Sequence, residues 1–182
     1  MSSRTGCWKA TAREDPAKSP LLAQSDLFFA ATHRPRAKLR LSIDSLPGAK
    51  KSATALTDAV RAARAHGEVA AAAEAWDELA RQLLEHGAGV SASMSLAQAR
   101  EAFNPLSHAA VKLLQHFGNP TAEAIRLAHC PMAANDAGAS WVQREATVAN
   151  AYFGAEMPTC GEVRATLEPG EYLPAHFAEP AR

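Results

Sequence analysis

The sequence predicts a mainly α protein: an antiparallel helical bundle with a C-terminal irregular cap that contains one or two short strands. Two observations lead to this fold class. Apolar residues recur at helical spacing from residue 53 to residue 117, and turn-forming residues replace that periodicity after residue 120. With 182 residues, of which 47% are hydrophobic, the chain is long enough to form one domain with a substantial core.

The first 50 residues differ in charge from the rest. They hold nine Lys/Arg and four Asp/Glu, a net +5, whereas the remainder holds ten basic and fifteen acidic residues, a net −5. Residues 1–50 show no helical periodicity, so we expect a basic, disordered leader followed by a single domain over 51–182. No signal peptide is visible, because the apolar stretch 21–31 is broken by Gln24, Ser25 and Asp26.

Charge and hydropathy exclude two classes of partner. The acidic part offers no electrostatic footprint for nucleic acid, and the basic part contains no recognisable nucleic-acid-binding motif. No apolar run approaches the roughly 20 residues that a transmembrane helix needs. We therefore expect neither nucleic-acid binding nor membrane insertion.

Two helices are expected first. One begins near residue 53 and stops at Gly67, and its apolar face carries Leu56, Val60 and Ala63. The next follows over 68–86, with an apolar seam at steps of three and four formed by Val69, Ala72, Trp76, Leu79 and Leu83. His86-Gly87 is expected to end it, and residues 87–95 read as a loop.

The third helix has the strongest periodic signal. Its apolar stripe steps by three and four through Leu96, Ala99, Phe103, Leu106, Ala110, Leu113 and Phe117. Ser95 can cap its start, and Gly118-Asn119-Pro120 stops it. Pro105 lies inside, and because the stripe continues in phase across it we expect one helix kinked near residues 101–105.

The cap begins after residue 120 and combines turn residues with one clear strand signal. Residues 162–167 alternate apolar and polar side chains, which predicts a short strand. Trp141, Tyr152 and Phe153 are expected to pack the cap onto the bundle.

The scarce sulfur residues gather in two segments of this cap. In "HCPM", Pro131 disfavours a helix at Cys130, and in an extended chain Cys130 and Met132 share a face while His129 points the other way. In "MPTC", Met157 and Cys160 are three residues apart, so one turn would bring both sulfurs to the same side.

This set of side chains points to a soft metal ion. Two thiolates and two thioethers, with an imidazole nearby, favour Cu(I) over magnesium, calcium or manganese, and methionine argues against structural zinc. The candidate ligands are Cys130 and Cys160 as thiolates, Met132 and Met157 as thioethers, and His129 as an accessory ligand or as a group that supports the ligands from behind.

Structural interpretations stay open beside the metal site. The methionines can be packing residues and His129 a hydrogen-bonded core residue. Cys130 and Cys160 can form a disulfide, and closing a loop of about 30 residues would stabilise the fold by roughly 3–4 kcal/mol. A redox enzyme is the weakest reading, since the cysteines lack Cys-x-x-Cys spacing and no catalytic motif is present. We expect no enzymatic activity.

Two segments resemble a small bacterial domain of unknown function. That domain occurs alone or at the C-terminus of periplasmic adaptor (membrane-fusion) subunits of copper/silver-type heavy-metal efflux systems. The resemblance covers about residues 53–167, including the Phe-x-Pro-Leu-Ser helix in 99–118, with Ala151 where the family has proline. The matching motif residues are His129, Cys130, Pro131, Met132, Gly138, Ala139, Trp141, Asn150, Tyr152, Phe153, Gly154, Met157, Cys160 and Gly161.

The resemblance implies a heavy-metal-binding domain, most simply for Cu(I), in resistance or efflux handoff. It implies a periplasmic location and efflux adaptor or pump components as partners. The alternative is a metal-free interaction module, stapled by a Cys130–Cys160 disulfide, that docks on an efflux component.

Overall fold

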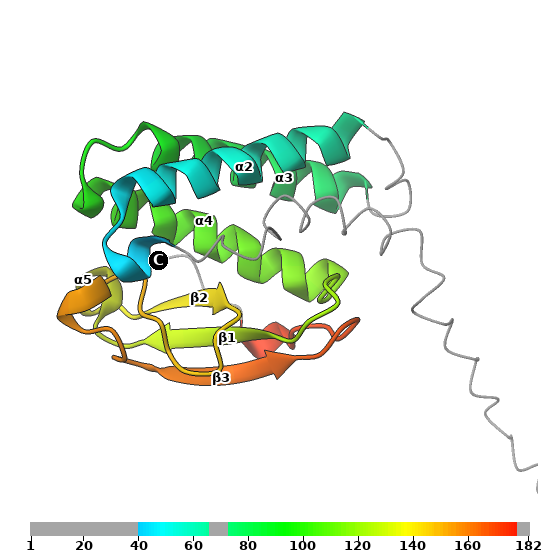
Figure 1. Ribbon diagram of the computed structural model, residues 1–182. Coiled ribbons are helices and arrows are strands. Elements are labelled where there is room, and N and C mark those ends of the chain that lie inside the picture. Colours follow the sequence, from blue (N-terminus) through cyan, green and yellow to red (C-terminus); the bar gives the residue numbers. More distant parts are fainter. Residues whose placement is uncertain (1–39, 66–72, 178–182) are drawn as a thin grey trace, which may run out of the picture.

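The computed structural model describes residues 40–65 and 73–177. Figure 1 shows a layer of three long helices above a small sheet, with α2 (Leu46–Ala65) packed on α3 (Ala73–Ala92) and α3 packed on α4 (Leu96–Phe117). The described chain is therefore mainly α, as the sequence predicts, and a small antiparallel sheet lies near the C-terminus where an irregular cap was expected. Within the described part of the chain, no helix is both long and apolar enough to cross a membrane.

The described structure begins ten residues before the boundary expected at residue 50. A 3-10 helix, η2 (Arg40–Ile43), comes first, and only 1% of Leu41 is exposed. Residue 50 lies inside α2, and Leu41 and Ala49, both before the expected boundary, belong to the hydrophobic core. The rest of the expected leader, residues 1–39, lies outside the described residues.

The start of α2 has a cap that the apolar pattern does not reveal. The Ser45 hydroxyl accepts a hydrogen bond from the Gly48 N–H at 3.2 Å, and the Ser45 carbonyl accepts from the Ala49 N–H at 2.8 Å. These bonds satisfy donors that a helix N-terminus leaves without intrahelical partners. The helix thus begins before the stripe of Val60 and Ala63 that predicted it; both residues are buried as expected.

The predicted end of the second helix at His86-Gly87 is wrong, because α3 continues to Ala92. Gly87 is buried in the helix, and a Cβ there would lie 2.7 Å from the Thr57 methyl carbon on α2. Glycine here allows α2 and α3 to approach closely instead of ending the helix. Leu79 and Leu83 are buried as the stripe predicts, whereas Val69 and Ala72 lie outside the described residues.

The third helix, α4, has the predicted bounds and caps. Ser95 Oγ accepts from the Gln98 N–H at 3.2 Å, and Gly118, at a φ of +73°, donates to the Leu114 carbonyl at 3.1 Å. The helix continues through Pro105 as one element. It also buries residues off the predicted stripe, among them Ser107, Val111 and Leu114, because the sheet covers a second side of it.

The sheet has three strands instead of the one or two expected. They are β1 (Ile125–Cys130), β2 (Ala139–Gln143) and β3 (Glu162–Leu167), in the order β2-β1-β3 with both pairs antiparallel. β3 has the predicted bounds. The sequence does not signal β1, because it is central and buried along nearly its whole length, so apolar and polar residues do not alternate.

The sheet joins the helical layer along β2. The Ser107 hydroxyl on α4 donates to the Ser140 carbonyl at 2.7 Å. Trp141 is fully buried, and its ring centroid lies 5.8 Å from that of Tyr152, which in turn lies 5.4 Å from Phe103 on α4. This chain of rings confirms that Trp141 and Tyr152 pack the cap onto the helices.

Candidate functional site

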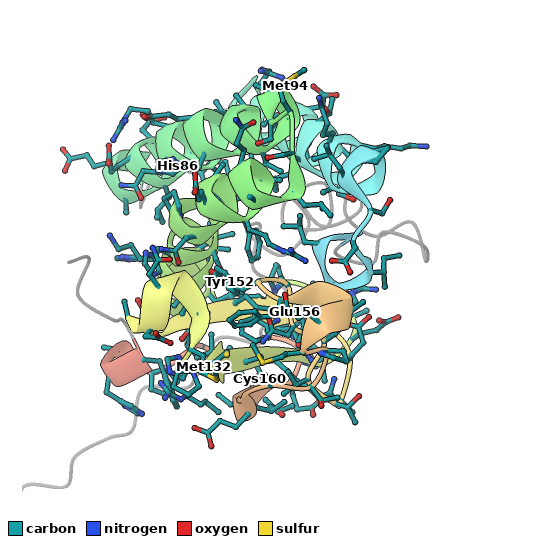
Figure 2. All side chains as sticks on the ribbon, turned by 90° about the vertical axis from the view of Figure 1, so that its left-hand side faces the viewer. His86, Met94, Met132, Tyr152, Glu156 and Cys160 are labelled. Atoms are coloured by element: carbon teal, nitrogen blue, oxygen red, sulfur yellow. The ribbon has the colours of Figure 1, made fainter. Side chains whose placement is uncertain are left out.

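The two sulfur segments meet at one end of the sheet. β1 ends there at Cys130, α5 (Ala133–Asp136) follows it, and η4 (Gly154–Glu156) lies just before the start of β3 (Figure 1). Figure 2 looks onto this end and shows Met132 and Cys160 beside each other on the near surface.

The thiols converge without a bond between them. Cys130 Sγ and Cys160 Sγ are 3.1 Å apart, well beyond the ~2.05 Å of a disulfide, and both cysteines are free. The Met132 sulfur lies 3.9 Å from Cys160 Sγ. Exposure increases from Cys130, which is fully buried, through the half-buried Cys160 to Met132, 47% exposed.

The expectation of an extended "HCPM" segment is wrong beyond Cys130. Pro131 and Met132 form a turn, and Met132 has helical dihedrals of φ −87° and ψ −11°. The turn is continued by three residues at positive φ, Ala134, Asn135 and Asp136, which reverse the chain toward β2. It is this reversal, and not strand alternation, that places the thioether of Met132 against Cys160.

His129 is oriented away from the sulfurs. It pairs with Ser140 across β1 and β2, and its Nδ1 lies 3.1 Å from Ser140 Oγ. Its ring packs over Gly138, where an added Cβ would approach the ring to 3.1 Å. His129 is thus a buried hydrogen-bonded residue whose backbone, not its ring, borders the thiol pair.

Met157 joins this end of the sheet through its backbone. Its carbonyl accepts from the Cys160 N–H at 3.3 Å, so a tight turn forms as expected. The Met157 side chain is half-buried, and among the described residues its thioether makes no hydrogen-bond contact with either thiol. The structure therefore brings together three of the five predicted ligands: Cys130, Met132 and Cys160.

Gly161 brings β3 close to the end of β1. Its φ is +113°, and a Cβ at this position would lie 2.3 Å from the His129 carbonyl oxygen and 3.2 Å from the Cys130 Cα. Only glycine fits such a contact between two backbones. The close approach holds Cys160, the preceding residue, beside Cys130.

Asn150 organises the loop that leads to Cys160. It is fully buried, and its Nδ2 donates to the Cys160 carbonyl at 2.8 Å. Its Oδ1 accepts from the N–H groups of Tyr152 and Phe153, at 2.8 and 3.0 Å, and its own N–H donates to the Pro158 carbonyl at 2.9 Å. The sequence marks Asn150 as part of a motif but does not reveal this role.

A charged contact fastens the same loop to the helical layer. The Arg100 guanidinium on α4 pairs with Asp44 and donates to the Ala151 carbonyl at 3.2 Å, while Asp44 Oδ2 accepts from the Ala155 N–H at 2.9 Å. A Cβ at Gly154 would fall on this ion pair. The hydrogen bond from Ala155, followed by the one from Arg100, lowers the pKa of the Asp44 carboxyl.

The electrostatics favour protonated Cys160 before any ligand binds. The hydrogen bond with Cys130, then burial, raises the pKa of the Cys160 thiol above its ordinary value of 9.0. The arrangement offers two chemistries. The pair can lose its protons to bind a soft cation, with the Met132 thioether as an additional donor, or it can lose two electrons and two protons to form a disulfide.

A comparison with known families matches the helical layer. Residues 40–122 match the sequence model of a family described as a protein of unknown function (DUF3347). The matched region includes α2, α3 and α4 and ends just before β1, so the sulfur residues lie beyond it. No curated protein and no solved structure matches the chain.

Proposed function

We propose that this protein binds a heavy-metal ion, most simply Cu(I), through Cys130, Cys160 and Met132. The observation that carries the proposal is the convergence of two unbonded thiols, 3.1 Å apart, with a thioether 3.9 Å from one of them. These three donors come from segments about 30 residues apart, so the fold assembles them. The role is binding rather than catalysis.

The donor types favour Cu(I) over harder ions. Thiolates and thioethers are soft ligands, whereas magnesium, calcium and manganese prefer oxygen. Structural zinc sites use Cys, His and carboxylate ligands, so the methionine would add little to zinc affinity. Among the described residues no group of three or more His, Cys, Asp or Glu side chains is placed to hold a metal ion, so the proposed site depends on the Met132 thioether as its third donor.

The remaining two candidates have indirect roles in the proposed site. Met157 lies in the turn that precedes Cys160 and would supply a second thioether if its side chain turned toward the ion. His129 supports the site from the other face of β1, where its Nδ1 and Ser140 Oγ, 3.1 Å apart, hold the strand end in place.

The biological setting follows from the motif resemblance. The two sulfur motifs resemble those of domains attached to copper/silver efflux adaptors, which supports a role in metal resistance or handoff, a periplasmic location, and efflux adaptor or pump components as partners. In such a setting the exposed thioether of Met132 would be the first ligand that an acceptor protein meets.

The alternative is a metal-free interaction module stapled by a Cys130–Cys160 disulfide. The same 3.1 Å approach of the two sulfurs favours it, because little movement separates the thiols from a bond. Here Met132 and Met157 would be packing residues only.

A Cu(I) titration separates these functions. The anaerobically reduced protein, in a Cys7→Ser background that leaves only the two cap cysteines, should bind about one Cu(I) against a competing chelator, and excess Zn(II) should not displace it. Cys130→Ser or Cys160→Ser should remove most of the affinity. The Cu(I) affinity should also decrease as the pH is lowered, because each thiol must lose a proton before it can bind the ion.

Matched methionine variants test the third donor. Leucine is close to methionine in volume, so Met132→Leu should keep the fold and weaken Cu(I) binding. Met94→Leu is the control, since Met94 is 81% exposed and lies in the α3–α4 connection. Unchanged Cu(I) affinity in a variant that combines Cys130→Ser with Cys160→Ser would discard the metal site and leave the disulfide-stapled module.

A further inference from the structure

We infer that Asn150 is a positioning residue that sets the separation of the Cys130 and Cys160 thiols. The inference concerns the geometry of the pair, whichever chemistry the pair performs. Only its metal readout rests on the proposed function.

The hydrogen bonds of Asn150 leave the loop little freedom. Its side-chain oxygen fixes the start of the loop at Tyr152 and Phe153, and its backbone N–H holds Pro158. The remaining donor, Nδ2, reaches the carbonyl of Cys160 itself at 2.8 Å. One buried amide therefore ties both ends of an eleven-residue loop, residues 150–160, to a single point.

The position of the Cys160 carbonyl sets how far Cys160 lies from Cys130. On one side Gly161 presses against the His129 carbonyl, where a Cβ would come within 2.3 Å, so the chain cannot move toward β1. Among the described residues, movement away from β1 is opposed by the bond from Asn150 Nδ2, by the bond from the Cys160 N–H to the Met157 carbonyl, and by the pairing of Glu162 with His129; of these, only the Asn150 bond holds the Cys160 carbonyl itself. Losing that bond would release Cys160 from Cys130, because a carbonyl left without its donor turns toward water.

Aspartate is the sharpest substitution. Asn150→Asp keeps the shape and the acceptor oxygen, so the bonds from Tyr152 and Phe153 can persist. It replaces the Nδ2 donor with a carboxylate oxygen facing the Cys160 carbonyl, which is repulsive. With its carboxyl ionised, the variant therefore lacks the one contact that the inference depends on.

Asn119 provides a matched control at the other end of the sheet. It is also fully buried, its Nδ2 donates to the Glu123 and Leu167 carbonyls at 2.9 Å, and its Oδ1 accepts from the Thr121 N–H at 2.9 Å. Asn119→Asp makes the same chemical change, with the same charge, far from the thiols.

The thiol readout is the equilibrium with glutathione disulfide in the Cys7→Ser background. The reaction breaks the glutathione S–S bond, forms the Cys130–Cys160 bond and yields two glutathione thiols, which take up the two protein protons. Its equilibrium constant is the effective concentration of the pair. Asn150→Asp should lower that value at least about tenfold, the change expected for one lost buried hydrogen bond. Asn119→Asp should leave it within about twofold while lowering the melting temperature.

Two results count against the inference. An effective concentration in Asn150→Asp equal to that of the wild type overturns the inference. An equal decrease of the effective concentration in Asn119→Asp also overturns it, because any destabilisation would then loosen the thiol pair. Should Asn150→Asp fail to fold by circular dichroism, Asn150→Ser takes its place, because serine cannot reach the Cys160 carbonyl.

Cu(I) affinity of the same variants adds a second readout. It should fall in Asn150→Asp and hold in Asn119→Asp. A wild type that binds no Cu(I) would reject the proposed function and leave the thiol result to judge the role of Asn150.

Discussion

At both ends of the sheet a buried asparagine fixes a loop with the same hydrogen bonds, but the two loops carry different side chains. At each end a fully buried asparagine accepts from the N–H two residues later and donates to a backbone carbonyl across a loop. At the Asn119 end the receiving carbonyl belongs to Leu167, an apolar residue packed beside Leu114 and Leu173. At the Asn150 end it belongs to Cys160.

The comparison shows that the same arrangement of asparagine hydrogen bonds can hold a loop whichever side chain the loop carries. A buried amide whose hydrogen bonds are all made fixes a backbone turn. The side chain on that turn then determines whether the residue packs into the core or offers a reactive group. Leucine at one end completes the core. Cysteine at the other end places a half-buried thiol beside a buried one. Variants at both ends can therefore separate effects on stability from effects on the thiol pair.

The largest effect is expected from truncating the core behind each end. Phe103→Ala should lower the free energy of unfolding by roughly 3–5 kcal/mol and Leu114→Ala by roughly 2–5 kcal/mol, because both side chains are buried. Phe103 contacts Tyr152 in the sulfur loop, with ring centroids 5.4 Å apart, so its loss should also lower the effective concentration of the thiols. Denaturant unfolding and the glutathione equilibrium measure the two quantities. An equal effect of Leu114→Ala on the thiols would erase the contrast between the ends.

A smaller but sharper contrast is expected between two glycines. Gly161→Ala, at φ +113° and with a Cβ 2.3 Å from a backbone oxygen, should cost about 2–4 kcal/mol and push Cys160 away from Cys130. Gly118 has a φ of +73°, and an added Cβ would lie 3.0 Å from the Glu171 carbonyl oxygen. Gly118→Ala should therefore lower the free energy of unfolding by about 1–2 kcal/mol and leave the thiols unchanged. Thermal melts and the glutathione equilibrium test both statements, and a costlier Gly118→Ala would reverse the proposed order.

Much of the helical layer is predictable because its apolar stripes are periodic. The stripe in Leu96–Phe117 and the caps at Ser95 and Gly118 give the whole of α4. The errors arise where a residue has two possible roles. Gly87 can stop a helix or let two helices approach, and only the presence of Thr57 opposite it decides. Likewise, β1 is buried on both faces and has no alternation to detect.

The sequence names five candidate ligands, and the structure brings three of them together: Cys130, Met132 and Cys160. The contacts that hold this end of the sheet in place have no signal in the sequence. The anchoring contacts of Asn150 and of Asp44 with Arg100 were not predictable, because they join residues 10 to 111 positions apart without any periodic signal. Specific polar contacts of this kind depend on the completed fold.

The charged anchor of the sulfur loop should show a modest dependence on acid. The pKa of Asp44 is lowered, so its contribution to stability is present above its ordinary value of 3.8 and is lost as the pH falls below it. Asp44→Asn should destabilise the protein at pH 7 by under about 1 kcal/mol, since the pair is partly exposed, and the gap to the wild type should close toward pH 3. Asp58→Asn, in the exposed pair with Arg61, is the control with little effect at either pH. A gap that stays constant with pH would contradict the role of the ionised carboxylate.

The smallest expected effect is the ionisation of Cys160, and it tests the sulfur end alone. The hydrogen bond with Cys130 is the first cause of the raised pKa of Cys160, followed by burial. Because the folded-state pKa is raised, the associated stability is present below the ordinary value of 9.0 and is lost as the pH rises through the folded pKa. In a Cys7→Ser background, alkylation of Cys160 by iodoacetamide should therefore be slower at pH 8 than alkylation of an unconstrained cysteine, since only the thiolate reacts. Removing the partner with Cys130→Ala should lower the pKa and speed the reaction, whereas Asn119→Asp at the other end of the sheet should leave the rate as it is. A pH–rate profile that does not move in Cys130→Ala would show that the two thiols do not interact, and the contrast between the two ends would then rest on burial alone.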